Sequence, residues 1–129
     1  MKKDRFIAKK SLGQNFINDE NFLQKLSSLI VTDNDSLIIE IGPGKGALTK
    51  ELVKKKNSQI FVIEKDNELI DDLVRFSKVS KNFRIFHEDA LKINYNKFIQ
   101  ENSIIVGNLP FNISSNLLMT WIFKLRAAH

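Results

Sequence analysis

The sequence predicts an α/β fold in which helices alternate with the strands of a mostly parallel sheet, and three observations support this prediction. Short apolar runs of strand length are separated by segments in which apolar residues recur at helical spacing. The first run, residues 37–41, leads directly into a turn with three glycines in five positions, 42–46. The second run ends in an acidic residue, Glu64, about 20 residues beyond that turn. Such alternation produces parallel strands joined by right-handed crossovers.

The predicted elements follow one another in a simple order. A first helix begins after Asn18 or Asp19, either of which can cap it, a second follows the glycines, and Asp66 caps a third. Strands are expected at 37–41, 59–64, 83–87 and 103–107, a solvated lysine run, 54–56, ends the second helix, and a last helix follows residue 115. The apolar faces of the first three helices are expected to comprise Phe22, Leu23, Leu26, Leu29 and Ile30; Ala47, Leu48, Leu52 and Val53; and Leu69, Ile70, Leu73 and Val74.

Polar residues and glycines follow or close all four predicted strands. Ligands of parallel α/β sheets bind outside the carboxyl ends of the strands. The residues at these ends are Gly42, Glu64, the Glu88–Asp89 pair and Asn108. We therefore expect them to gather at one edge of the sheet and to form a binding site.

The glycine turn, residues 42–46, is typical of two cofactor classes. Gly42 and Gly44 let the backbone approach a ligand closely, and Glu64 is placed to bind ribose hydroxyls. The spacing Gly42-x-Gly44-x-x-Ala47 fits a dinucleotide fingerprint, whereas Glu40-x-Gly-x-Gly-x-Gly better fits the pattern of S-adenosylmethionine (SAM) methyltransferases. The glycines and Glu64 alone leave both an NAD-dependent oxidoreductase and a methyltransferase open.

The tetrapeptide Asn108-Leu109-Pro110-Phe111 favours methyl transfer to a base. The lone pair of an exocyclic amine is delocalised into the ring, and acceptors aimed at the two N–H bonds localise it. The Asn108 side-chain oxygen and the Leu109 carbonyl supply two acceptors, and Pro110 fixes the turn. Phe111 offers a ring on which an unpaired or flipped base can stack, which contributes about 1–3 kcal/mol.

The composition sets limits on the class of protein. The net charge of +5 suits a polyanionic partner such as nucleic acid. The absence of cysteine excludes a disulfide scaffold and a Cys-ligated metal site, and His87 is expected to be a strand-end residue, so we expect no metal. No apolar run is long enough to span a membrane and no signal-peptide pattern opens the chain, so we expect a cytoplasmic protein with no membrane partner.

Five segments together resemble a known family. They are Lys10-Ser-Leu-Gly-Gln-Asn-Phe-Ile17, Glu40-Ile-Gly-Pro-Gly-Lys-Gly-Ala-Leu-Thr49, Glu64, Glu88-Asp-Ala-Leu91 and Gly107-Asn-Leu-Pro-Phe-Asn-Ile-Ser114. In this order and spacing they are similar to the KsgA-type ribosomal RNA small-subunit adenine dimethyltransferases. The resemblance runs from about residue 10 to residue 121 and implies a Rossmann-like SAM-dependent methyltransferase fold.

The resemblance implies a reaction and a role for each motif. Two methyl groups would pass from SAM to N6 of each of two adjacent adenines in a hairpin of small-subunit ribosomal RNA, on the immature small ribosomal subunit. Asn15 and the backbone of Ile17 would close over the methionine part of SAM, and residues 1–17 would form a basic arm and covering segment. The other expected cofactor contacts are Gly42 and Gly44 near the carboxyl and sulfur, Glu64 on the ribose, Asp89 on the adenine amino group with Ala90 beside the ring, and Asn108 touching both SAM and the target amine.

The chain departs from the family pattern in residues and in length. Phe111 stands where the family usually has Tyr, and Lys45 where it often has Leu; Leu109 favours the small-subunit branch. The family sheet has seven strands and a helical C-terminal domain follows it, so we expect residues 1–129 to be the N-terminal part of the methyltransferase domain, with uncertain activity of their own. Strand 103–107 would then form an edge, and the last helix would lose neighbours for Leu117, Leu118, Trp121 and Ile122, so we expect self-association through the sheet edge and the last helix. The alternative function is a non-catalytic RNA-binding, ribosome-assembly or transcription factor on the same fold.

Overall fold

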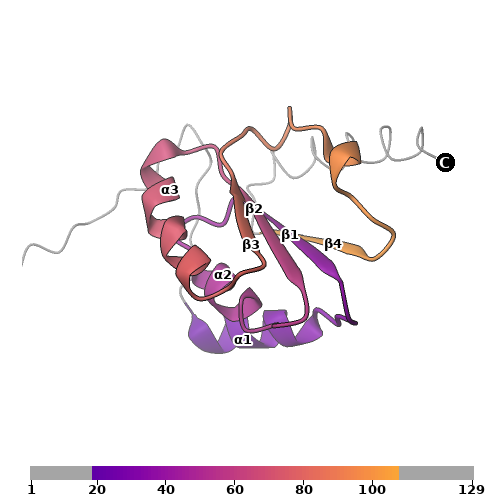
Figure 1. The fold of residues 1–129 in the computed structure, drawn as a ribbon. Helices are drawn as coiled ribbons and strands as arrows, with labels where there is room; N and C mark the ends of the chain where they lie inside the picture. The colour runs from indigo at the N-terminus through magenta and orange to yellow at the C-terminus, as the bar shows by residue number, and fades with distance from the viewer. Residues whose placement is uncertain (1–18, 108–129) are drawn as a thin grey trace, which may run out of the picture.

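The computed structural model describes residues 19–107, and these residues form the predicted alternation of helices and strands (Figure 1). Expectations for the basic arm 1–17, for Asn15, Ile17 and residues 108–111, and for the last helix lie outside the described residues. The elements are α1 (Glu20–Leu29), β1 (Leu37–Ile41), α2 (Ala47–Leu52), β2 (Gln59–Ile63), α3 (Asn67–Val74), the 3-10 helix η2 (Arg75–Lys78), β3 (Phe83–Phe86), the 3-10 helix η3 (Tyr95–Lys97) and β4 (Ser103–Gly107).

Local signals explain where the helices begin. Asp19 is the N-cap of α1, and its side chain accepts a hydrogen bond from the backbone N–H of Phe22. Asp66 caps α3 in the same way by accepting from the N–H of Glu68 at 3.0 Å. Both helices therefore begin where the sequence predicts.

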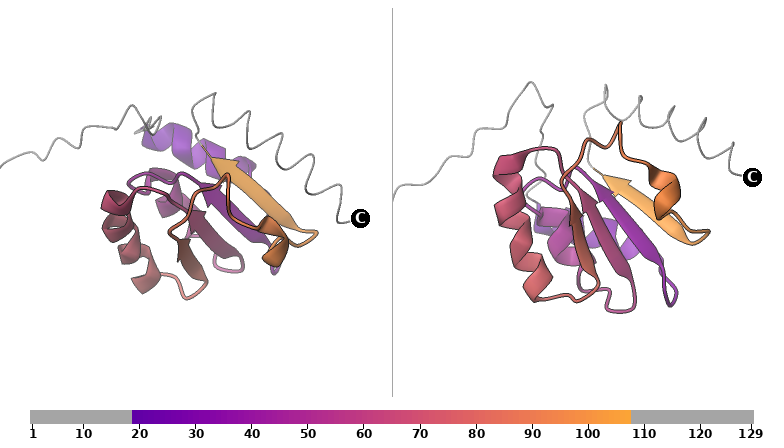
Figure 2. Two further views of the ribbon diagram at one scale, coloured as in Figure 1. Left: turned by 90° about the horizontal axis from the view of Figure 1, so that it is seen from above. Right: turned by 45° about the horizontal axis from the view of Figure 1, so that its top comes forward.

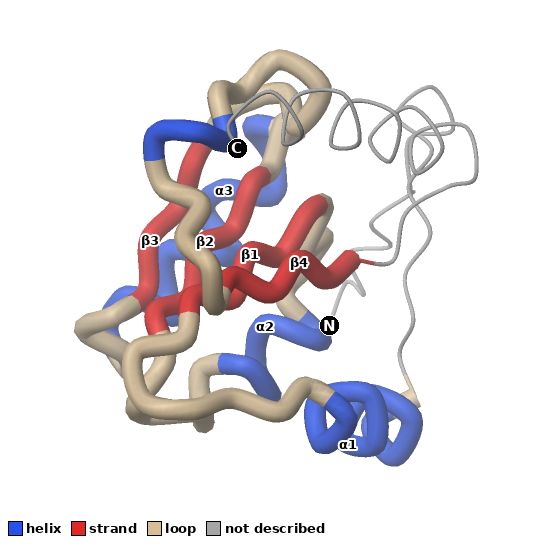
Figure 3. The backbone as a smooth tube through the Cα atoms, turned by 90° about the vertical axis from the view of Figure 1, so that its right-hand side faces the viewer, coloured by secondary structure: helices blue, strands red, loops and turns tan. Residues whose placement is uncertain are grey.

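The four strands form one parallel sheet in the order β3-β2-β1-β4, which Figure 3 shows in red. The central strand β1 is buried along its whole length, which explains its nearly continuous apolar run. Ile41 at the end of β1 pairs with Ile63 of β2 on one side and with Gly107 of β4 on the other, and Ile63 pairs with Phe86 of β3. The carboxyl ends of all four strands are thus aligned at one edge, called here the carboxyl rim.

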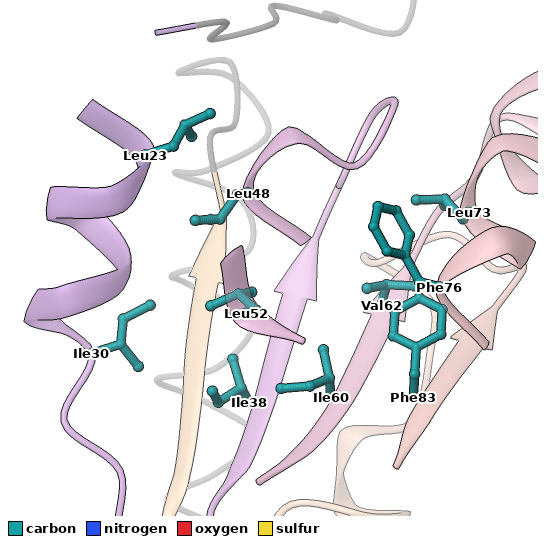
Figure 4. Packing of buried hydrophobic residues seen from close by; sticks show 10 residues of the cluster. All are labelled: Leu23, Ile30, Ile38, Leu48, Leu52, Ile60, Val62, Leu73, Phe76 and Phe83. Atoms are coloured by element: carbon teal, nitrogen blue, oxygen red, sulfur yellow. The ribbon is translucent and has the colours of Figure 1, made fainter. Parts of the chain in front are cut away.

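Two apolar layers cover the sheet, one on each face. The three helices and η2 pack against one face, where their buried side chains meet those of the strands (Figure 4). The segment between β3 and β4, residues 89–99, covers the other face and is called here the covering segment (Figure 2, orange). The chain adds β2 and β3 on one side of β1 and then β4 on the other side. The order of strand addition therefore reverses at the β1–β4 pair, and ligands of such sheets bind at this switch point.

The helices bury narrower stripes than the sequence predicts. In α1, Leu23 and Ser27 are buried and Ile30 follows at the cap, whereas Phe22 is 47% and Leu29 77% exposed. Val74 of α3 is likewise 44% exposed, contrary to its assignment to the core face. The reason is that α1 packs on α2 at the margin of the layer, so only one line of its side chains reaches the core.

The lysine run after α2 is also displaced from its expected place. The helix ends at Leu52, so the lysine run, residues 54–56, lies in the turn that leads to β2 rather than in the last helical turn. Lys54 forms an exposed ion pair with Glu51 at 2.8 Å. Its position still faces solvent, as the sequence predicts.

Candidate cofactor site

The glycine turn connects β1 to α2 through three residues with left-handed backbone conformations. Gly42, Gly44 and Gly46 have φ values of 62°, 59° and 89°, which residues with a Cβ rarely adopt. The N–H of Gly42 donates to the carbonyl of Ile63 at 2.9 Å, so the turn continues the β1–β2 pairing. At Gly46 a Cβ would also collide with the ring of Phe76. The glycines therefore serve the turn itself and the packing of α2 as well as any ligand.

Glu64 turns its carboxylate toward the glycine turn. Its Oε2 accepts a hydrogen bond from the N–H of Gly44 at 3.3 Å, and its Oε1 accepts from the N–H of Asp66 at 2.9 Å. Burial raises the pKa of the Glu64 carboxyl above its ordinary value, and these backbone donors partly oppose the increase. A carboxylate has about four acceptor sites, so the three backbone donors, from Gly44, Asp66 and Lys65, still leave capacity for hydrogen bonding to a ribose. The residue thus fits the role that the sequence predicts.

Asp89 lies in a turn just beyond β3. Its Oδ1 accepts from the N–H of Leu91 at 2.9 Å, and its Oδ2 lies 3.3 Å from Nζ of Lys65. The hydrogen bond from Leu91 and the charge of Lys65 hold the pKa of Asp89 below its ordinary value. The carboxyl is therefore ionised at neutral pH and can only accept hydrogen bonds, as a partner of an amino group must.

His87 and Glu88, which precede Asp89 in the chain, were also considered as site residues. Nε2 of His87 lies 3.2 Å from the carbonyl oxygen of Lys65, which agrees with its expected place at a strand end. Glu88 is exposed. Among residues 19–107, no group of three or more His, Cys, Asp or Glu side chains is arranged to hold a metal ion.

A buried pair beneath the glycine turn was not assigned a role from the sequence. Glu40 is only 3% exposed, and its Oε2 accepts a hydrogen bond from the hydroxyl of Thr49 in α2 at 2.6 Å. Burial raises the pKa of Glu40 to about 7; the Thr49 hydroxyl opposes this increase, and the nearby charge of Glu64 adds to it. The signal in the sequence was an acidic residue inside an otherwise apolar strand. This hydrogen bond joins β1 to α2, the two elements on either side of the glycine turn.

The structure brings four of the predicted cofactor residues to the carboxyl rim. They are Gly42, Gly44, Glu64 and Asp89. The predicted catalytic residues 108–111 and the covering residues Asn15 and Ile17 lie outside the described part of the chain. Gly107, which directly precedes Asn108, pairs with Ile41, so β4 ends beside the start of the glycine turn.

Two further observations concern the remaining surface. An open hollow at the opposite end of β1 and β2 is lined by residues 32–34 and 55–57, and it has no part in the rim. No helix in the described range 19–107 has the length and apolar character needed to cross a membrane.

Comparison with known proteins identifies the family. A model of the ribosomal RNA adenine dimethylase family matches residues 5–129. The ribosomal RNA small subunit methyltransferase A of Pelagibacter ubique is 38% identical over 118 residues, which cover 92% of this chain and 44% of that protein. The protein of the same name from Mycoplasma mobile is 44% identical over 110 residues, 85% of this chain and 41% of its own length. The chain thus spans less than half the length of these relatives.

Solved structures give the same fold. The 23S rRNA methyltransferase ErmE superposes with a TM-score of 0.69 at 25% identity, over 81% of this chain and 41% of that one. A dimethyladenosine transferase from Plasmodium falciparum also gives 0.69, at 22% identity, over 84% and 38%. These likenesses agree with the parallel sheet and with the family match along nearly the whole sequence. The chain belongs to the ribosomal RNA adenine dimethylase family.

Proposed function

We propose that this chain is the N-terminal, cofactor-binding part of a SAM-dependent enzyme that dimethylates N6 of two adjacent adenines in small-subunit ribosomal RNA. The observation that carries the proposal is the carboxyl rim, where Glu64 is hydrogen-bonded to Gly44 and Asp89 stands beyond the adjacent strand. Family membership and the names of the relatives support the reaction and its substrate. Residues 1–17 form a basic arm and cofactor cover in this proposal.

The donor and acceptor groups of the rim match the parts of SAM. Glu64 accepts from the ribose hydroxyls, Asp89 accepts from the adenine amino group, and the backbone at Gly42 and Gly44 lies against the carboxyl and sulfur region. Asn15 and Ile17 close over the methionine part. SAM supplies a methyl group activated by its bond to a positively charged sulfur. No residue needs to act as a covalent nucleophile, because the amine of the base would take the methyl group directly as the bond from sulfur to the methyl carbon breaks, which would release S-adenosylhomocysteine and a proton from the amine.

The acceptors of the target amine belong to the segment that follows β4. Asn108 and the carbonyl of Leu109 accept from the two N–H bonds and favour the localised lone pair, Pro110 sets the turn, and Phe111 stacks on the base. The pairing of Gly107 with Ile41 supports this assignment, because the chain leaves β4 next to the glycine turn. A direct test is methyl transfer from radiolabelled SAM to immature small ribosomal subunits in the full-length protein.

In that test we expect Asn108→Ala to abolish most transfer while RNA binding persists, since RNA affinity comes mainly from contacts between basic side chains and phosphates. Asn102→Ala is the matched control, because Asn102 lies just before β4, at the other end of that strand, and donates to the carbonyl of Asp35. Transfer by the wild type to immature subunits supports the proposal. Near-normal single-turnover rates for Asn108→Ala contradict the catalytic role, and RNA binding without any transfer by the wild type favours a non-catalytic assembly factor.

The partners in this proposal are ribosomal RNA and the immature small subunit, in the cytoplasm. The net charge of +5 supports a phosphate-rich partner. Within the described residues, β4 pairs only with β1, so its outer edge and its partly buried apolar side chains have no strand beside them. Such an edge is a template for another strand, and the isolated 129-residue chain self-associates through it in this proposal.

A further inference from the structure

The covering segment contains the only tyrosine of the chain, which the sequence analysis did not single out. Tyr95 is 3% exposed, and its hydroxyl donates a hydrogen bond to the carbonyl oxygen of Ala90 at 2.7 Å. This is the ordinary distance for a hydrogen bond between an O–H donor and a carbonyl acceptor. It joins the interior of the covering segment to the turn that carries Asp89.

That turn is built around Asp89. The backbone carbonyl of Asp89 accepts from the N–H groups of Lys92 and Ile93 at 2.9 and 3.0 Å, while Oδ1 accepts from Leu91. One carboxylate oxygen is therefore used inside the turn, and Oδ2 lies 3.3 Å from Nζ of Lys65, which follows the end of β2. The direction of Oδ2 depends on the turn keeping its shape.

The ring of Tyr95 is packed among other apolar side chains. It belongs to the apolar cluster on the second face of the sheet, with Ile93 and Phe61, and it lies 5.8 Å from the ring of Phe98. Phe98 in turn packs against Phe61 and Phe86. Aromatic side chains packed in this way have little rotational freedom, so the hydroxyl is a fixed donor at the base of the Asp89 turn.

We propose that Tyr95 is a positioning residue for the adenine end of the cofactor site, acting through the Ala90 carbonyl to hold Asp89 in the orientation that accepts the adenine amino group. The inference rests on the proposed function for the identity of the ligand. Tyr95 does not touch the cofactor in this scheme. Its effect is selective for the base, because the glycine turn and Glu64 are held by other contacts.

The first test needs no cofactor. In Tyr95→Phe the ring stays and the hydroxyl is lost, so the N–H of Leu91, which is bonded to Asp89, should exchange with solvent about fivefold faster by NMR, as expected for losing one hydrogen bond. Ser36→Ala is the matched control. It removes another buried hydroxyl, bonded to Asp33 at 2.6 Å, at the opposite end of the sheet, and it should leave Leu91 unchanged.

The second test measures recognition of the base by the full chain. Calorimetry compares S-adenosylhomocysteine with S-inosylhomocysteine, which has a carbonyl in place of the amino group. We expect the wild type to prefer adenine by about tenfold or more, as for one hydrogen bond to a charged acceptor. Tyr95→Phe should lose about fivefold of this preference, whereas Ser36→Ala should keep all of it. A structural role alone would weaken both ligands equally.

The outcomes separate the two proposals. An unchanged preference in Tyr95→Phe, or unchanged exchange of Leu91, overturns the positioning role while leaving the proposed function intact. A wild-type chain that shows no preference for adenine overturns the assignment of Asp89 within the proposed function, and the role of Tyr95 with it. Melting temperatures of both variants show that each is folded under the conditions of the measurements.

Discussion

Replacement of Glu64 tests the cofactor site most directly, because this carboxylate contacts the glycine turn and retains acceptor capacity. In Glu64→Ala the ribose hydroxyls lose a charged acceptor. Hydrogen bonds to charged groups contribute about 1.5–3 kcal/mol. At about 1.4 kcal/mol per tenfold change, losing one such bond weakens SAM binding by roughly 10- to 150-fold.

Glu64→Ala also changes the stability of the fold, through two effects of opposite sign. The alanine variant leaves the N–H groups of Gly44 and Asp66 without their acceptor, which destabilises the fold. It also removes a buried carboxylate whose pKa is raised by desolvation, which acts in the opposite direction. Glu64→Gln separates the two effects, since it keeps the shape and one acceptor oxygen but removes the charge. We expect its affinity for SAM to lie between those of wild type and Glu64→Ala.

The assay is calorimetric titration of SAM and, in parallel, of NAD. Glu101→Ala is the control, because Glu101 is an exposed acid just before β4, at the end of the sheet opposite the rim. It should bind SAM as the wild type does. An unchanged dissociation constant for Glu64→Ala would refute the assignment of Glu64 to the ribose, and tighter binding of NAD than of SAM would refute the cofactor.

Three further outcomes follow from the described residues. The pKa of Glu40 is raised from 4.5 to about 7, so the protonated carboxyl stabilises the fold below pH 4.5 and this contribution is lost as the pH rises through 7. In chemical unfolding, the wild type should lose about 3 kcal/mol of unfolding free energy relative to Glu40→Gln between pH 4.5 and about pH 8. A difference between the two proteins that does not change with pH would contradict this prediction. Gly46→Ala should lower the unfolding free energy by about 3 kcal/mol, because of its positive φ and the collision with Phe76, and Phe76→Leu should recover part of that loss in a double-mutant cycle. Light scattering of the isolated chain at micromolar concentration should detect self-association through the edge of β4, whereas a monomer that binds no hydrophobic dye would argue against it.

Much of the fold could be predicted from local signals. Apolar runs gave the positions of all four strands to within one residue, and Asp19 and Asp66 marked the starts of two helices, because strand periodicity and N-capping depend on neighbouring residues only. The alignment of the strand ends followed from parallel pairing. For that reason the rim residues Gly42, Glu64 and Asp89 could be named before the structure was known.

Contacts between distant parts of the chain were decided by the tertiary structure alone. Periodicity shows that α1 is amphipathic, but it does not show how wide a stripe its neighbours cover, so Phe22 and Leu29 were wrongly placed in the core. The buried bond between Glu40 and Thr49 forms because the glycine turn folds α2 back along β1. Tyr95 reaches Ala90 because the covering segment packs on the face of the sheet away from the helices. Composition and spacing determine which segments become strands and helices, whereas the partner of each buried side chain depends on how those segments pack.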